Sequence, residues 1–221
     1  GVFSSVDPTQ EQIAAKIIEQ EAPDMRISMS HEIGRVGLLE RENATILNAC
    51  LSRVSESAVG AFKLAIEDLG LSSSLFLSQN DGTLMDSEFA IKYPVLAISS
   101  GPTNSMRGAS FLTGIHDAIV VDIGGTSTDV GILRNGFPRE SSIAVDIGGV
   151  RTNFRMPDVL SIPLGGGSLV KTSPLVIGPD SVAMRLMEQS LVFGGSIMTT
   201  TDVAVAAGMA DIGQKSLVSK I

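Results

Sequence analysis

A carboxylate followed by two glycines and a run of hydroxyl residues stands near the middle of the sequence, and these residue types could bind a phosphate. The segment reads Asp122-Ile-Gly-Gly-Thr-Ser-Thr-Asp129. Gly124 and Gly125 have no Cβ, so the backbone can turn sharply and bring its N–H groups close to an anion. The next three residues add hydroxyl donors: Thr126, Ser127 and Thr128.

The carboxylates at the two ends of this segment extend the hypothesis. Asp122 follows an apolar run and supplies the hard oxygen that a hydrated Mg²⁺ prefers beside a triphosphate, so we predict that it holds magnesium through water. Asp129 either positions an attacking water or pairs with neighbouring backbone. For the motif taken alone, a tight hairpin whose glycines serve only the turn is the alternative.

Two common nucleotide motifs do not fit this segment. It lacks the Gly-Lys-Ser/Thr of a phosphate-binding Walker loop. Its glycines also have the wrong spacing for a dinucleotide fingerprint and lie between two predicted strands instead of opening a helix. The sequence therefore favours a phosphate hairpin of another kind.

The surrounding patterns predict the elements that position this hairpin. Apolar runs at residues 118–121 and 130–133 predict the two strands that flank it, and a helix of small residues follows Gly101 and Pro102. A second Asp-Ile-Gly-Gly, at residues 146–149, is interpreted as another turn of the same sheet. Together these patterns indicate an α/β fold.

Elsewhere the chain predicts further helices and strands. Helical spacing of apolar residues predicts a long helix at residues 38–69, ended by Gly70, and residues 95–98 read as a strand. The single cysteine, Cys50, lies among apolar residues of that helix, so we predict that it is buried. A polar run at residues 199–202 could cap a final helix through Met209.

Composition narrows the class of protein. The 221 residues carry a net charge of −8, with Lys and Arg scattered along the chain, so nucleic-acid binding is not expected. No stretch approaches the roughly 20 apolar residues that span a bilayer. The first ten residues also lack the pattern of a signal peptide, so we expect no membrane partner and a cytoplasmic location.

Beyond the hairpin, segments along almost the whole chain carry a resemblance to a known family. They occur in the order seen in the A-type subunit of the hydantoinase/oxoprolinase family: Ser30-His-Glu-Ile33, Glu40-Arg-Glu-Asn-Ala-Thr-Ile-Leu-Asn48, Gln79-Asn-Asp-Gly82, Ser100-Gly-Pro102, Asp122-Ile-Gly-Gly-Thr-Ser-Thr-Asp-Val130, Gly165-Gly-Gly-Ser168 and Thr201-Asp202. The hairpin and the small-residue helix before it also resemble the second lobe of actin-like ATPases.

This resemblance implies a fold and an activity. We expect an actin-like, ribonuclease H-like ATPase lobe, with a mixed sheet and flanking helices, that binds Mg-ATP. Such enzymes couple ATP hydrolysis to opening or carboxylating a cyclic amide such as a hydantoin or 5-oxoproline, or a ketone. They often work with a B-type partner subunit, so a hetero-oligomer is expected.

The resemblance also implies additional site residues. Gly165, Gly166 and Gly167 either contact the nucleotide or only let a strand turn into a loop, and the resemblance favours contact. His31 and Glu32 are candidates for substrate binding. Asp158 is a third, although relatives commonly carry a His shortly after this Asp and here Val159 follows, which puts a metal site there in doubt.

The expected organisation is one A-type domain over residues 1–221. Residues 1–94 form a helical and α/β part, and residues 95–221 form the second actin-like lobe. The family's other Asp-Gly-Gly hairpin is not found before Thr9, so we expect a fragment without its first lobe and with negligible activity alone. A nucleotide-dependent scaffold without small-molecule chemistry is the main alternative, and a stand-alone sugar or acid kinase is a weaker one.

Overall fold

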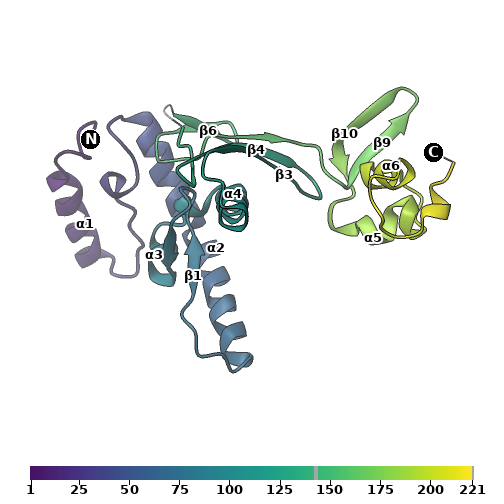
Figure 1. Cartoon of the computed structure of the whole chain (residues 1–221). Coiled ribbons are helices and arrows are strands. Elements are labelled where there is room, and N and C mark those ends of the chain that lie inside the picture. The colour runs from purple at the N-terminus through teal and green to yellow at the C-terminus, as the bar shows by residue number, and fades with distance from the viewer. Residues whose placement is uncertain (142–143, 221) are drawn as a thin grey trace. The chain divides into compact units, whose positions relative to one another are not determined.

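The computed structural model describes residues 1–141 and 144–220. Contacts divide the chain into two compact units (Figure 1). The first unit contains Gly1–Asp117 and Leu133–Asp158, and the second contains Ala118–Ile132 and Val159–Ile221. Among the described residues, no helix has the length and apolar character needed to cross a membrane. The functional boundary expected between residues 94 and 95 stays a prediction.

Helices dominate the first unit. They are α1 (Thr9–Glu21), η1 (Ser30–Glu32), α2 (Leu39–Asp68), α3 (Ser87–Lys92), η2 (Pro94–Ala97) and α4 (Ser100–Thr113). The predicted long helix is confirmed as α2, which ends just before Gly70, a glycine with a φ of +65°. The small-residue helix is confirmed as α4.

The core of the first unit forms where α2 meets its neighbours. One apolar cluster joins Ala44 and Val95 to Phe154 and Met156, and another joins Val59 to the residues around α3. The strand predicted at residues 95–98 is wrong, because residues 95–97 belong to η2, which begins at Pro94 and packs on α2.

The prediction that Cys50 is buried is also wrong. Its position on α2 is exposed, as are many large apolar residues along the same helix, because the first unit covers only part of this helix's surface. An apolar neighbourhood in the sequence did not identify the covered side of the helix.

Ten short strands, counted over residues 1–141 and 144–220, complete the two units. Their bounds are β1 (Phe76–Ser78), β2 (Leu84–Asp86), β3 (Ala118–Ile123), β4 (Thr128–Arg134), β5 (Phe137–Pro138), β6 (Val145–Ile147), β7 (Val150–Thr152), β8 (Val159–Ile162), β9 (Ser168–Thr172) and β10 (Leu175–Ser181). Strand β4 has β3 as its neighbour in the sheet and pairs antiparallel with β8, with Thr128 opposite Ile162.

The two Asp-Ile-Gly-Gly turns do not belong to one sheet, so that interpretation is wrong. The first lies between β3 and β4, whereas the second joins β6 to β7, which among the described residues form a separate two-stranded sheet. Val145 and Ile147 of β6 pack on the apolar core of the first unit.

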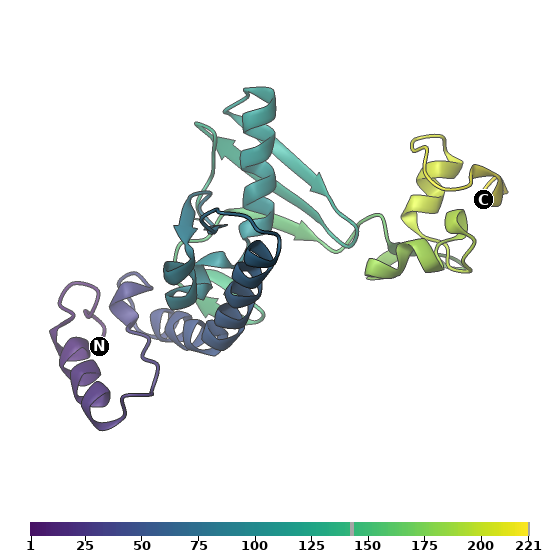
Figure 2. The same cartoon turned by 90° about the horizontal axis from the view of Figure 1, so that it is seen from below.

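The second unit ends in a group of short helices beside the β9–β10 hairpin. They are η3 (Ala183–Arg185), α5 (Leu186–Gln189), η4 (Leu191–Phe193), α6 (Thr200–Ala206) and η5 (Lys215–Leu217), and Figure 2 shows the most C-terminal of them, in yellow, gathered near the end of the chain. The predicted cap is confirmed, because Thr199 and Asp202 form a capping box at the start of α6. The buried Asp202 also accepts a hydrogen bond from the Val192 amide at 2.7 Å.

Candidate functional site

The site predicted at Asp122–Asp129 is a surface hairpin of the second unit. β3 ends at Ile123, β4 begins at Thr128, and the Gly124 amide donates to the Ser127 carbonyl at 2.8 Å, which closes the turn. Gly124, Gly125 and the neighbouring Thr126 are exposed. A ligand could therefore approach this turn from solvent.

The glycine run at residues 165–167 packs directly against the hairpin. The amides of Gly166 and Gly167 donate to the carbonyls of Gly124 and Gly125 at 3.0 and 2.7 Å. A Cβ on Gly165 would lie only 2.6 Å from the Gly124 carbonyl oxygen. Only glycine permits this approach of two backbones, since real Cβ atoms essentially never lie within 3.0 Å of another heavy atom.

This pairing sets the direction of the hairpin's own amides. In a trans peptide the N–H points opposite to the C=O of the same unit. Because the Gly124 and Gly125 carbonyls point at the glycine run, the N–H groups of Gly125 and Thr126 point away from it. Across the described residues, the amides of Gly125, Thr126 and Ser127 donate to no protein acceptor. Three successive unused donors on an exposed turn are an arrangement that suits an anion.

Two threonines hold the glycine run from the other side. The Thr200 hydroxyl donates to the Gly165 carbonyl, and the Thr201 hydroxyl donates to the Gly166 carbonyl at 2.8 Å. The Thr201 amide donates to the same Gly166 carbonyl at 3.0 Å. The start of α6 thus supports the run, which in turn supports the hairpin. Thr200 is a supporting residue that our sequence reasoning missed, although it adjoins the recognised Thr201–Asp202 segment.

The other residues of the motif differ in how far the protein already uses them. The Asp122 carboxylate, half-buried at the end of β3, forms no hydrogen bond within the described part of the chain, so its oxygens remain free to accept. The Asp129 carboxylate accepts from the Ser161 hydroxyl. Thr128 donates its only hydroxyl proton to the Leu164 carbonyl at 2.6 Å and would reach a phosphate only by giving up this bond.

These residues fit a magnesium-bound phosphate chain. The unused amides supply donors for phosphate oxygens, and Asp122 supplies an unengaged carboxylate for a hydrated cation. The structure describes no group of three or more His, Cys, Asp and Glu residues able to hold a metal, counting residues 1–141 and 144–220. A cation that relies mainly on water and phosphate oxygens therefore suits the site better than one held entirely by the protein.

The predicted substrate residues lie in the first unit. His31 and Glu32 form η1 and line one cavity of about 310 Å³. Asp158 is not among the residues that line this cavity, and its carboxylate pairs with Arg139. The structure thus places His31 and Glu32 in one cavity and leaves Asp158 out of it. The convergence of these three residues beside Asp122 stays a prediction.

His31 is held by a carboxylate from α1 that our sequence reasoning missed. The Glu11 Oε2 lies 2.9 Å from the His31 Nδ1 and accepts the His31 amide at 3.1 Å, and Glu11 also accepts the Ser30 hydroxyl. Burial alone would raise the pKa of Glu11, but hydrogen bonds from Ser30, His31 and Ser4 outweigh it and lower this pKa to about 2. No local sequence signal links Glu11 to His31, which lies 20 residues away.

Comparison with known families gives a match over most of the chain. The family model of hydantoinase/oxoprolinase matches residues 41–215. The alpha subunit of caprolactamase from Pseudomonas jessenii is 28% identical over 94% of this chain and 31% of its own length. The gamma subunit of acetophenone carboxylase from Aromatoleum aromaticum is 26% identical over 94% of this chain and 30% of its own length.

Solved structures agree with these sequence matches. The crystal structure of the ATP-dependent caprolactamase from Pseudomonas jessenii aligns with a TM-score of 0.73 at 27% identity, covering 96% of this chain and 32% of that one. A nucleotide-free acetone carboxylase aligns with a TM-score of 0.69 at 19% identity, covering 98% and 33%. The predicted actin-like ATPase fold is thereby confirmed. The chain spans about a third of the length of the relatives that it matches.

Proposed function

We propose, for a chain that belongs to the hydantoinase/oxoprolinase family, that the β3–β4 hairpin binds the phosphates of Mg-ATP within an enzyme that acts on a cyclic amide or a related carbonyl substrate. The observation that carries this proposal is the row of unused amides at Gly125, Thr126 and Ser127. It is supported by relatives whose names describe an ATP-dependent caprolactamase and a carboxylase.

Each residue of the hairpin has a role in this proposal. The amides would neutralise charge on the phosphate chain, and the Thr126 and Ser127 hydroxyls would add donors. Asp122 would hold Mg²⁺ through bound water, and the cation would supply further neutralisation. Asp129 is our candidate for orienting the attacking water. Thr128 and the glycine run border the phosphates: Gly165, Gly166 and Gly167 act by close approach, because their amides already donate within the protein.

The substrate and the assembly follow from the family. We propose that activation of a cyclic amide carbonyl by phosphorylation, as in hydantoin or 5-oxoproline opening, or a related carboxylation, is the reaction of the whole enzyme. A B-type subunit is the proposed partner, since the caprolactamase and acetophenone carboxylase relatives are named as subunits. His31, Glu32 and Asp158 remain proposed substrate residues, and the cytoplasm is the proposed location.

Nucleotide titration of the isolated chain tests the phosphate site. In ¹H–¹⁵N spectra, Mg-ATP at millimolar concentration should shift the amides of Gly125, Thr126 and Ser127, and AMP should not. The amides of Gly148 and Gly149, in the other Asp-Ile-Gly-Gly turn, are the internal control. Shifts confined to residues outside the hairpin, or none at all, would refute the phosphate site.

Phosphate release distinguishes the enzyme from a scaffold. We propose that this chain alone turns over Mg-ATP negligibly, because a two-lobed site closes only when both walls are present. Turnover at ordinary enzyme rates by the isolated chain would contradict this. If a B-type subunit and a cyclic amide together fail to stimulate hydrolysis by an assembly that contains the chain, the nucleotide-dependent scaffold becomes the better interpretation.

A further inference from the structure

The cavity lined by His31 is a second polar site, and it lies entirely within the first unit. Its walls come from four segments: residues 31–35, residues 79–81, Leu96 and Arg155. At about 310 Å³ it is at the small end of the range for small-molecule sites. It has both charged and amide-bearing side chains, so it can satisfy a small polar ligand.

The His31 ring is fixed from one edge only. Its Nδ1 lies 2.9 Å from the Glu11 carboxylate, and its side chain is only 15% exposed. Since a carboxylate only accepts hydrogen bonds, the nitrogen that faces it must carry the proton. Within the described residues the Nε2 has no hydrogen-bond partner, so it is the edge left for a ligand.

Glu11 is itself held in place. Its two oxygens accept from Ser30, from the His31 ring and from the His31 amide. The buried Arg41 donates from Nε to the Ser30 hydroxyl at 3.0 Å and from Nη1 to the Arg35 carbonyl at 3.1 Å. A carboxylate with this many partners has little freedom to rotate, so it can set the orientation of the imidazole.

Hydrogen-bond donors face the same cavity. Arg35 and Arg155 both line it, and both pair with a single carboxylate, Glu140, at 3.2 and 3.8 Å. Because two guanidinium groups share one carboxylate, some of their N–H donors remain without an acceptor from that carboxylate. A cavity with an acceptor, the His31 Nε2, and donors from arginine suits a group that offers N–H and C=O on one edge. A small cyclic amide offers both, because its ring holds the amide cis.

We propose that Glu11 is a positioning residue that keeps His31 protonated at Nδ1, so that its bare Nε2 accepts the N–H of a cyclic amide bound in this cavity. The choice of a cyclic amide rests on the proposed function, whereas the position of the proton on His31 does not. The chain contains only two histidines, which makes a direct test practicable.

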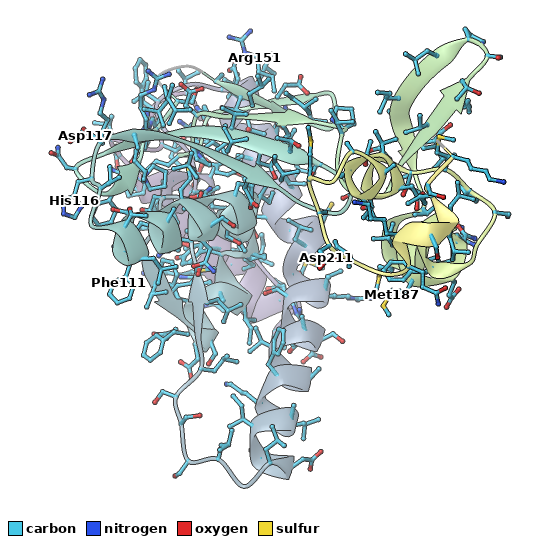
Figure 3. The ribbon with its side chains drawn as sticks, turned by 45° about the vertical axis from the view of Figure 1, so that its right-hand side comes forward. Phe111, His116, Asp117, Arg151, Met187 and Asp211 are labelled. Carbon is cyan, nitrogen blue, oxygen red and sulfur yellow. The ribbon has the colours of Figure 1, made fainter. Side chains whose placement is uncertain are left out.

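The test uses ¹⁵N-histidine-labelled protein at about pH 8, where an ordinary imidazole is neutral. We expect the His31 signals to show a protonated Nδ1 and a bare Nε2. His116, which Figure 3 shows at the surface beside Asp117, is the matched control. Its signals are assigned as those that disappear in His116→Gln. In Glu11→Gln the His31 signals should move toward a mixture of the two tautomers, and in Glu11→Asp they should recover in part. A protonated Nε2 in the wild-type chain would overturn the proposal even if Glu11→Gln failed to fold.

Two lactams then test the ligand. 2-Pyrrolidone carries an amide N–H, and N-methyl-2-pyrrolidone does not. We expect the first to shift the His31 Nε2 signal at least threefold more than the second at equal concentration, with the His116 signals unchanged by either. Equal responses, or no response, would overturn the assignment of a cyclic amide to this cavity. The result is independent of ATP, so it can fail while the phosphate hairpin stands, and the reverse also holds.

Discussion

The chain contains the tetrapeptide Asp-Ile-Gly-Gly twice, and the two copies have different structures. In the copy at β6–β7, Gly148 and Gly149 have φ of +60° and +84°, which is the two-residue turn that suits a tight hairpin. The Asp146 carboxylate accepts the Gly149 amide at 2.7 Å. That turn therefore uses its own carboxylate to satisfy its own donor.

The copy at β3–β4 leaves the same groups unused. Gly124 and Gly125 are not in the left-handed region. Within the described part of the chain, the Asp122 carboxylate accepts no hydrogen bond, and the amides of Gly125, Thr126 and Ser127 have no protein acceptor. The difference comes from outside the tetrapeptide, because only the first copy has a glycine run packed against its carbonyls. A motif of this kind thus presents free amide donors only when another segment hydrogen-bonds to its carbonyls and so turns its N–H groups toward solvent.

Replacing the first glycine of the run at residues 165–167 should have the largest effect. In Gly165→Ala the new Cβ would lie 2.6 Å from the Gly124 carbonyl oxygen and the Thr126 amide nitrogen, and backbone atoms cannot yield as a flexible side chain does. We expect the free energy of unfolding to fall by about 3 kcal/mol, the upper end for overpacked sites. Urea denaturation measures it.

The control for this variant is Gly125→Ala, which has open space around the added Cβ. It should change the free energy of unfolding by less than about 0.5 kcal/mol. If the two variants unfold at the same urea concentration, the glycine run does not support the hairpin as we describe.

Acid should separate carboxylates that the fold uses from those that it leaves free. Hydrogen bonds lower the pKa of Glu11 from 4.5 to about 2, so this group stabilises the fold above its unfolded pKa and ceases to do so as the pH falls through its folded pKa. We expect a loss of about 2–3 kcal/mol between about pH 4.5 and pH 2. Thermal unfolding across this range measures it.

Glu11→Gln should remove most of that pH dependence, because glutamine does not titrate. Asp122→Asn should leave it unchanged, since no hydrogen bond of the described residues depends on that carboxylate. An acid transition that persists in Glu11→Gln with the same size would mean that another group is responsible.

Asparagine substitutions test the two aspartates of the tetrapeptides against each other. Asp122→Asn should weaken Mg-ATP binding about tenfold, equivalent to about 1.4 kcal/mol, because it removes the charge proposed to hold the hydrated cation. Asp146→Asn keeps an oxygen for the Gly149 amide and should bind Mg-ATP as the wild-type chain does. Titration followed at the Thr126 amide measures both, and equal weakening in both would argue against a specific site.

Local signals in the sequence were sufficient for the elements around the hairpin. Apolar runs and glycines predicted the strands that flank it, and the polar run at residues 199–202 predicted the cap of α6, because these features depend on neighbours along the chain. The buried position of Cys50 and the strand at residues 95–98 were wrong, because each depends on which surface the rest of the fold covers.

The support of the site could not be predicted in the same way. The sequence singled out the glycine run but left open whether it contacts a nucleotide or serves the backbone. It gave no sign that Gly166 and Gly167 bond to carbonyls about 40 residues earlier, or that Glu11 holds His31. Such contacts form only when the tertiary fold brings distant segments together, and the type of one residue does not identify its distant partner.

A smaller effect tests the second tetrapeptide directly. Gly148 has a φ of +60°, a conformation that costs an L-residue with a Cβ about 1–2 kcal/mol, so Gly148→Ala should lower the free energy of unfolding by about 1 kcal/mol. Gly125, which corresponds to Gly149 in the second tetrapeptide, has neither a positive φ nor a close neighbour. Gly125→Ala should therefore show no such cost. Chemical denaturation of the two variants compares them. If Gly125→Ala were destabilised as much as Gly148→Ala, Gly125 would share the strained geometry of the second turn, and the unused amides at the first turn would lose the structural reason given for them.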